Sequence, residues 1–283
     1  MKICLDPAMI RSRPIEDVFR IAREAGYRYL EFTWREDFLP SRRGRQPSFE
    51  TIKRITKASE DSGVSIASIM TIYEWSSPDE ETRKEAVKYW KRAIQVASDL
   101  GCDRLNTEFS GDRLNPLLSE RSFLRSAEEL DFFLNEKGVQ IYIEPHPGDF
   151  VETGEQAANI LRGLQSDRFG YLLCAPHTFY LGGSIQDQIR NTKDILGHVH
   201  LADTFKPTRV ILNPPAEVRI HEHLDIGQGE IDWRAFFATL AEIGYDNIMT
   251  VAVFAWPEQA VQSYQKNYSA VMQLLRQANL VND

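Results

Sequence analysis

The six histidines of this 283-residue chain all lie in one stretch of its second half, between positions 146 and 223. His146 and His177 follow runs of apolar and β-branched residues that are typical of buried strands. His200 belongs to a later run of this kind, and His221 and His223 come after it in a segment with three prolines. Imidazoles gathered at the ends of neighbouring strands can bind a metal ion or transfer protons. We therefore expect one reaction centre built around several histidines.

Two carboxylates end strand-like runs beside these histidines. Glu144 closes the run 140–144, and residues two apart in a strand point to the same side, so Glu144 and His146 can face one centre. Glu108 closes the strand-like run before that one. We predict that Glu144 takes part in catalysis and that Glu108 or His146 carries a proton. The alternative is that each acid is structural, although a carboxylate buried here without a cation would be costly.

Histidine and glutamate side chains are suitable ligands for Zn²⁺, Mn²⁺ or Fe²⁺. The metal ligands that we predict are Glu144, His177, His200 and His223, and the identity of the divalent metal ion (Mn, Zn, Fe or Mg) stays open. Such an ion would act as a Lewis acid on adjacent oxygens of a polyol or keto-sugar. His198 lies deeper in its strand than His200, and we expect it to fill the interior.

The composition excludes several classes of protein. The chain has 33 basic and 41 acidic residues and a net charge of −8, which is the wrong sign for a nucleic-acid-binding protein. The longest nearly apolar run, 248–256, is too short to span a bilayer. Three widely spaced cysteines give no disulfide framework and predict a cytoplasmic protein. We expect a small-molecule partner, with neither nucleic acid nor membrane involved, and a homo-oligomer remains open.

The elements that must position these residues form a repeat. Gly26, Gly63, Gly101 and Gly138 recur at a nearly constant spacing, each after an amphipathic stretch and before a strand-like run, and Gly244 repeats the pattern. Glycine just past a helix adopts the left-handed conformation without steric cost. The pattern thus predicts alternating helices and strands, with strands at 2–6, 29–33, 65–71, 104–107, 140–144, 170–174, 198–202 and 247–253.

Eight units of this kind predict an α/β fold, a closed (β/α)8 TIM barrel with parallel strands. We expect one domain over residues 1–283, because no linker interrupts the repeat. A long loop at 204–229 breaks the rhythm, and loops of this length in compact domains are usually functional. Trp34 and Tyr73 follow the second and third strands, where they either form a wall for a sugar face or only pack the top of the barrel.

Several strings resemble the xylose-isomerase-like TIM barrel superfamily over the whole chain. They are I-E-P-H at 143–146, H-V-H-L-A-D at 198–203 and G-Q-G-E-I-D-W at 227–233. The superfamily contains sugar isomerases, ketose 3-epimerases, inosose dehydratase and apurinic-site endonucleases. Within it, N-T-E-F-S-G-D at 106–112, A-P-H-T-F at 175–179 and L-N-P-P at 212–215 resemble the IolH family of myo-inositol catabolism proteins.

The resemblance implies a metal site in which two ligands have changed. Epimerases of the superfamily bind one divalent ion with two glutamates, an aspartate and a histidine, and Glu144 and His200 match the first glutamate and the histidine. Cys174 stands in place of the aspartate, and the second glutamate would fall near Ala252, where no carboxylate exists. The endonucleases use an acid-x-His pair in the long loop, and His223 matches that histidine. A shifted site with the ligands predicted above is therefore compatible with the resemblance.

The resemblance predicts a metal-dependent isomerase or epimerase of carbohydrate or myo-inositol catabolism that acts on a keto-polyol through an enediolate. Lys206 lies where the epimerases place a substrate-binding arginine, and Arg209 is the alternative. Because Ala252 removes one proton carrier, a lyase or dehydratase with one base and a metal is a second hypothesis. A barrel that has lost catalysis is a third, and DNA repair is opposed by the acidic charge.

Overall fold

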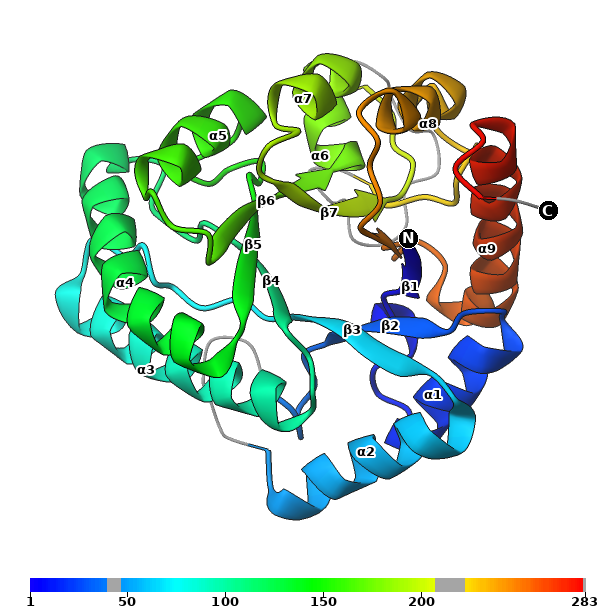
Figure 1. The fold of residues 1–283 in the computed structure, drawn as a ribbon, viewed down its shortest axis with the longest axis horizontal. Helices are drawn as coiled ribbons and strands as arrows, with labels where there is room; N and C mark the ends of the chain where they lie inside the picture. Colours follow the sequence, from blue (N-terminus) through cyan, green and yellow to red (C-terminus); the bar gives the residue numbers. More distant parts are fainter. Residues whose placement is uncertain (40–46, 207–221, 282–283) are drawn as a thin grey trace.

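The computed structural model describes residues 1–39, 47–206 and 222–281, and at its centre eight parallel strands form a closed barrel in chain order (Figure 1). The predicted (β/α)8 fold is confirmed. The observed strands differ from the predicted runs only at their ends. They are β1 (Lys2–Leu5), β2 (Tyr29–Thr33), β3 (Ser65–Met70), β4 (Arg104–Glu108), β5 (Gln140–Glu144), β6 (Phe169–Cys174), β7 (Leu196–Leu201) and β8 (Ile248–Val251).

Helices surround the barrel on its outside (Figure 1). Two short 3₁₀ turns, η1 (Ala8–Ile10) and η2 (Pro257–Gln259), follow β1 and β8. The α-helices of the described residues are α1 (Ile15–Glu24), α2 (Phe49–Ser62), α3 (Glu80–Asp99), α4 (Pro116–Lys137), α5 (Gly154–Gly163), α6 (Ala175–Tyr180), α7 (Ile185–Asn191), α8 (Trp233–Glu242) and α9 (Ala260–Gln277). None of these helices is long and apolar enough to cross a membrane.

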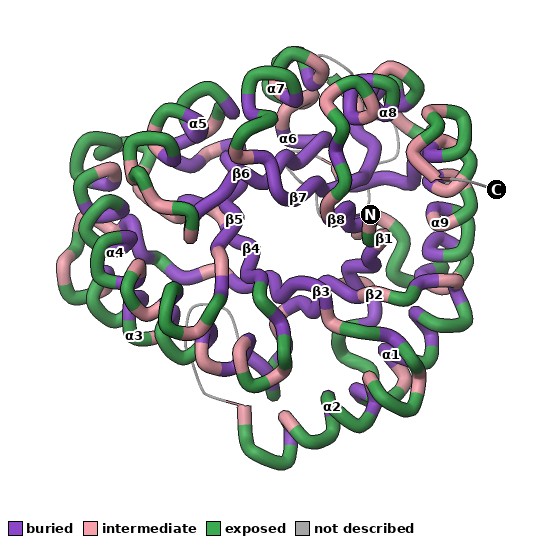
Figure 2. Tube along the Cα trace, viewed as in Figure 1, coloured by how far each residue is buried: buried purple, intermediate pink, exposed green. Residues whose placement is uncertain are grey.

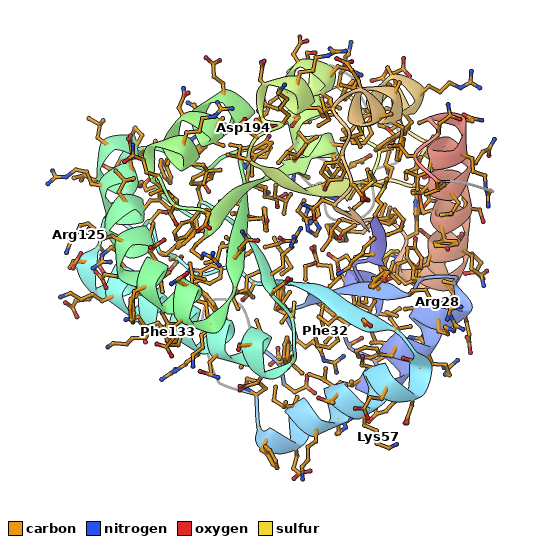
Figure 3. The ribbon with its side chains drawn as sticks, in the orientation of Figure 1. Arg28, Phe32, Lys57, Arg125, Phe133 and Asp194 are labelled. Carbon is orange, nitrogen blue, oxygen red and sulfur yellow. The ribbon has the colours of Figure 1, made fainter. Side chains whose placement is uncertain are left out.

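Burial explains why strands such as β6 are rich in apolar residues. Barrel strands meet the helices on one side and the interior on the other, and β6 and β7 are buried along their whole length (Figure 2). The helices bury only the side that faces the barrel. Charged side chains such as Lys57 on α2 and Arg125 on α4 project from the outer side into solvent (Figure 3). Polar residues inside the barrel therefore require a separate explanation.

The helix ends follow local sequence signals. The Asp79 carboxylate accepts a 2.9 Å hydrogen bond from the Thr82 amide and caps the start of α3. Gly63 and Gly138 end α2 and α4 in the left-handed region, with φ of 64° and 66°. This confirms the role predicted for the repeated glycines. Each of these glycines ends a helix and leads the chain into the next strand. The glycine thus fixes where the strand begins, and the length of the strand then fixes where it ends at the opposite side of the barrel.

The buried carboxylate of Asp203, which follows β7, holds together the two parts of the long loop at 204–229 that the structure describes. The Asp203 carboxylate accepts hydrogen bonds from the amides of Thr204 (2.9 Å), Gly227 (2.8 Å) and Ile231 (3.2 Å) and from the Trp233 indole (2.9 Å). Its backbone also pairs with the backbone of residue 224, directly after His223. Asp203 therefore holds residues 222–233, which we call the return segment, against the barrel and positions His223. Residues 207–221, with His221 and Arg209, lie outside the described residues.

Candidate active site at the carboxyl end of the barrel

A pocket of about 640 Å³ lies at the carboxyl end of the barrel strands, where enzymes of this fold carry their active sites. Its walls come from residues at or after the ends of all eight strands. Seven residues that the sequence predicted for the site line this pocket: Trp34, Glu108, Glu144, His146, His177, His200 and His223. The structure thus brings together side chains that are far apart in the sequence.

Glu144 lies at the end of β5 and is 3% exposed. His200 Nδ1 is 3.2 Å and His177 Nδ1 is 3.8 Å from Glu144 Oε2. Nevertheless, no donor among the described residues meets this oxygen in hydrogen-bond geometry. A buried carboxylate oxygen in this state is unfavourable unless a proton or a cation compensates its charge. In the metal-free protein, protonated His200 supplies a compensating charge, and a metal ion at this position would replace that proton.

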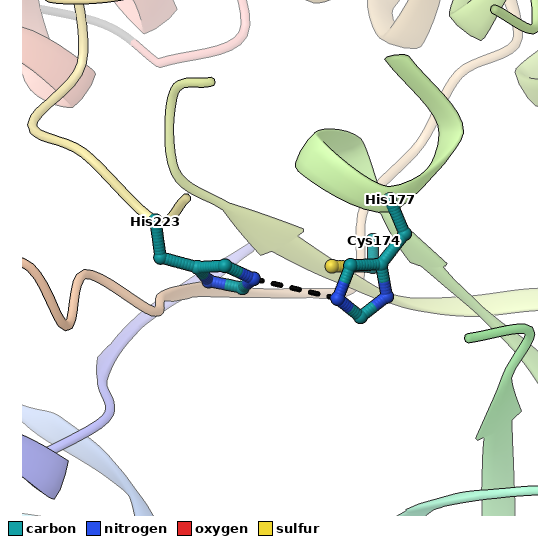
Figure 4. A group of neighbouring side chains, drawn as sticks. All are labelled: Cys174, His177 and His223. Carbon is teal, nitrogen blue, oxygen red and sulfur yellow. Dashed lines mark hydrogen bonds between the residues drawn. The ribbon is translucent and has the colours of Figure 1, made fainter. Parts of the chain in front are cut away.

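Cys174, His177 and His223 form one group of candidate metal ligands (Figure 4). Cys174 also belongs to a group with Glu144 and His200. Their donor atoms all lie within 4.8 Å of one another, and the two histidine Nε2 atoms are 3.4 Å apart. His223 Nδ1 donates to the carbonyl oxygen of Ala252 at 2.6 Å. This bond leaves the Nε2 lone pair of His223 facing His177. Ala252 thus supplies no carboxylate, but its backbone orients a histidine.

Glu31 on β2 contacts His200 behind the pocket and was missed by the sequence argument. It is fully buried, and its Oε1 accepts a 2.8 Å hydrogen bond from His200 Nε2. Ser68 and Asn106 also donate to it, and His198 Nε2 lies 3.1 Å from its other oxygen. Glu31 therefore holds the His200 ring so that Nδ1 faces Glu144, as carboxylates behind metal-binding histidines do.

The charges of this network follow from burial and pairing. Burial alone would raise the pKa of Glu31, but His200 and His198 outweigh it and hold this pKa well below its usual range. Burial opposes the charge of His200, yet Glu31 and Glu144 raise its pKa well above the usual value. For His198 burial dominates and lowers the pKa to about 4. His198 is fully buried, as predicted, and is a neutral part of the interior.

Five side chains make up what we call the metal-ligand cluster: Glu144, Cys174, His177, His200 and His223. All are at most 4% exposed. One thiol, three imidazoles and one carboxylate form a donor set that suits Zn²⁺ or Fe²⁺ better than Mg²⁺, because thiolates and imidazoles are the softer ligands. Burial, aided by Glu144, raises the pKa of the Cys174 thiol to about 12, so the thiol keeps its proton at neutral pH unless a metal ion binds the sulfur and releases that proton to solvent. The residues fit a metal ion.

Glu108 and His146 stand beside the metal-ligand cluster on the more open side of the pocket. His146 Nε2 is 3.9 Å from Glu108 Oε1, and the two side chains are 26% and 21% exposed. The ring centres of His146 and His177 are 4.6 Å apart. Both groups can therefore reach a molecule in the pocket, which is what a proton carrier requires. Their predicted catalytic role remains a prediction.

The structure places only some of the residues predicted to bind substrate in the pocket wall. Trp34 lines the pocket, and the guanidinium of Arg11, a pocket residue that the sequence argument missed, stacks on its ring at 4.0 Å. Lys206 is exposed, and its Nζ lies 5.9 Å from the ring centre of Phe179 instead of in the pocket wall. Arg209, the other predicted substrate ligand, lies outside the described residues.

The expectation that Tyr73 forms a wall of the site is corrected. Tyr73 is 1% exposed and lies outside the pocket lining. Its ring packs edge-on against Trp90 of α3 at 5.2 Å between centres and contacts Tyr89. The apolar ring is better stabilised between barrel and helix than at a wet mouth, so the second of the two sequence-based alternatives, packing, is the one observed.

Comparisons with known proteins agree with this architecture. A family model described as xylose isomerase-like TIM barrel matches residues 19–274. An inosose isomerase of Bacillus velezensis is 23% identical over 268 residues, which cover 90% of this chain and 89% of the relative. The inosose isomerase of Bacillus subtilis is 24% identical over 68% of this chain and 70% of its own length.

Solved structures share the same fold. The IOLI protein with a bound zinc atom has a TM-score of 0.80 and 19% identity, covering 98% of this chain and 99% of that one. An L-ribulose 3-epimerase has a TM-score of 0.76 and 17% identity over 99% of this chain and 96% of that one. The predicted superfamily resemblance is confirmed, and the inosose isomerases agree with the expected nearness to inositol catabolism. The chain belongs to the xylose isomerase-like TIM barrel family.

Proposed function

We propose that this protein is a metal-dependent isomerase or epimerase that acts on a keto-polyol, either a keto-inositol or a ketose. The observation that carries the proposal is the metal-ligand cluster, two groups of buried donors that share Cys174. Its other four side chains, Glu144, His177, His200 and His223, line a pocket that also holds Glu108 and His146. The relatives named inosose isomerase support the substrate class, and the zinc in the IOLI structure supports the metal.

The residues of this chain would divide the work as follows. Glu144, Cys174, His177, His200 and His223 would hold the ion. A divalent ion at this position, when bound, supplies a Lewis acid for the carbonyl and hydroxyl oxygens of the substrate. The Trp34 ring would cover an apolar face of the substrate, and Arg11, held on that ring, would donate to its oxygens.

Proton transfer falls to the groups on the open side of the pocket. Glu108, 3.9 Å from His146, would take the proton from the carbon beside the carbonyl, which gives an enediolate, and His146 would share or relay that proton. Return of the proton to the neighbouring carbon, together with transfer of the hydroxyl proton from one enediolate oxygen to the other, isomerises the substrate. Return to the same carbon from the other side epimerises it.

The direct test is product analysis with 2-keto-myo-inositol and D-fructose. We expect the metal-loaded protein to convert at least one of them into a product of unchanged mass, and chelator-treated protein to be inactive until the metal is restored. The control is chelator-treated protein reloaded with Ca²⁺, which prefers oxygen ligands and should not restore activity. A product lighter by one water would show the dehydratase instead, and no conversion by metal-loaded protein would contradict the proposal.

A further inference from the structure

Asp6 is a buried carboxylate in the pocket that no sequence pattern singled out. It follows β1 directly, lines the pocket and is 3% exposed. Among the described residues its carboxylate has one hydrogen-bond donor, the Ala8 amide at 2.8 Å, and no ion-pair partner. This carboxylate therefore keeps acceptor capacity toward the pocket that the protein itself does not use.

The barrel places Asp6 across the pocket from the other proton carriers. The strands are ordered β1 to β8 around a closed ring, so three strands separate β1 from β5 in either direction. Glu108 ends β4 and His146 follows β5, whereas Asp6 follows β1. All three side chains line the same pocket. A substrate in this pocket therefore has the Asp6 carboxylate on one side and Glu108 with His146 on the other.

This arrangement matters because inversion at carbon needs two proton carriers. A base on one face removes the proton from the carbon beside the carbonyl, and the electron pair moves into the enediolate. An acid on the opposite face then returns a proton to the same carbon, the electron pair moves back, and the configuration is inverted. One carboxyl group has gained a proton and the other has lost one, and exchange with water resets both. A pocket with groups on one face only would return the proton to the same side.

The environment of Asp6 suits this role. Burial, together with the charge of Glu31, raises the pKa of Asp6 to about 7, although His200, the Ala8 amide and Arg11 act in the opposite direction. A carboxyl group whose pKa is raised in this direction is a better proton donor partner for the enediolate and can also act as a base.

We propose that Asp6 is a catalytic acid–base residue that exchanges a proton with the substrate on the face opposite to Glu108 and His146. The assignment rests on the proposed function and specifies it, because it makes the reaction an epimerisation at the carbon beside the carbonyl. The substrate class is then a keto-polyol with a C–H group in that position whose two configurations are both accepted.

The test uses Asp6→Asn in the full-length, metal-loaded protein. The asparagine side-chain oxygen can still accept from the Ala8 amide, so the turn and the fold are kept while the proton carrier is lost. Asp187→Asn, an exposed carboxylate on α7, is the matched control. The probes are D-fructose and D-psicose, which differ only at the carbon beside the carbonyl, in D₂O, and metal content is measured in parallel.

We expect Asp6→Asn to keep its metal and to slow epimerisation by at least about 100-fold. In Asp6→Asn, solvent deuterium should still enter the sugar whose C–H proton is removed by Glu108. It should no longer enter the other sugar, whose proton is removed by Asp6 in the wild type. Glu108→Gln should show the reverse pattern. Epimerisation by Asp6→Asn at the control rate would overturn the assignment of Asp6 alone. Wild-type protein that holds metal but exchanges the proton of neither these two sugars nor 2-keto-myo-inositol would refute the proposed function and this assignment together.

Discussion

Glu144→Gln is expected to abolish metal binding and to lower turnover by about 10³-fold or more. The amide keeps the size of the carboxylate but removes its charge, and Glu144 Oε2 lies 3.2 Å from His200 Nδ1 and 3.8 Å from His177 Nδ1. Metal ions contribute several kcal/mol to transition-state stabilisation, and about 4 kcal/mol corresponds to this factor. Metal content by elemental analysis and turnover of the active ketone would be measured on the same samples.

The control for this variant is Glu60→Gln, which changes an exposed glutamate on α2. It should leave metal content and turnover at the wild-type level. Full metal occupancy in Glu144→Gln would contradict the assignment of this ligand.

Asp203→Ala is expected to lower the free energy of unfolding by about 4 kcal/mol. The substitution leaves the amides of Gly227 and Ile231 and the indole of Trp233 without their acceptor, and each unsatisfied buried donor costs about 1–3 kcal/mol. Water will accept hydrogen bonds from some of these donors, so the total cost stays below the sum of the three separate costs. The midpoint and slope of urea-induced unfolding, followed by circular dichroism, measure the change.

Asp232→Ala is the matched control in the same segment. The Asp232 carboxylate makes one exposed cap bond to the Ala235 amide at 3.0 Å, and removing such a cap costs about 1 kcal/mol. Both variants lose an acidic residue, so the difference between their free energies of unfolding measures the contribution of the buried hydrogen bonds around Asp203. Equal destabilisation by both substitutions would show that Asp203 does not hold the return segment.

The fold could be predicted because its signals are local. Gly63 and Gly138 mark helix ends through a conformation that other residues adopt at a cost, and the apolar runs between the glycines mark the strands. Strand ends also position His146, His177 and Glu144, so the face of the barrel that carries them followed from the strand assignment. Tyr73 was not predictable in the same way, since its ring turns outward toward Trp90 and the sequence does not show this direction.

The supporting residues of the site could not be predicted, because their partners are remote in sequence. Glu31 and His200 are 169 positions apart and meet only because the ring of strands closes. A glutamate between Leu30 and Phe32, in the middle of the strand 29–33, was the one available signal. Asp6 and Arg11 belong to no motif, and only the pocket reveals that they face the same space as Glu144.

The metal-ligand cluster is tested most directly by crystals of the zinc-loaded protein, with diffraction data collected on both sides of the zinc absorption edge. We predict one strong anomalous peak in contact with Glu144 and His200 and with at least one of Cys174, His177 and His223. Zinc found only on surface side chains, with hydrogen bonds from water or protein satisfying Glu144 Oε2, would contradict the account.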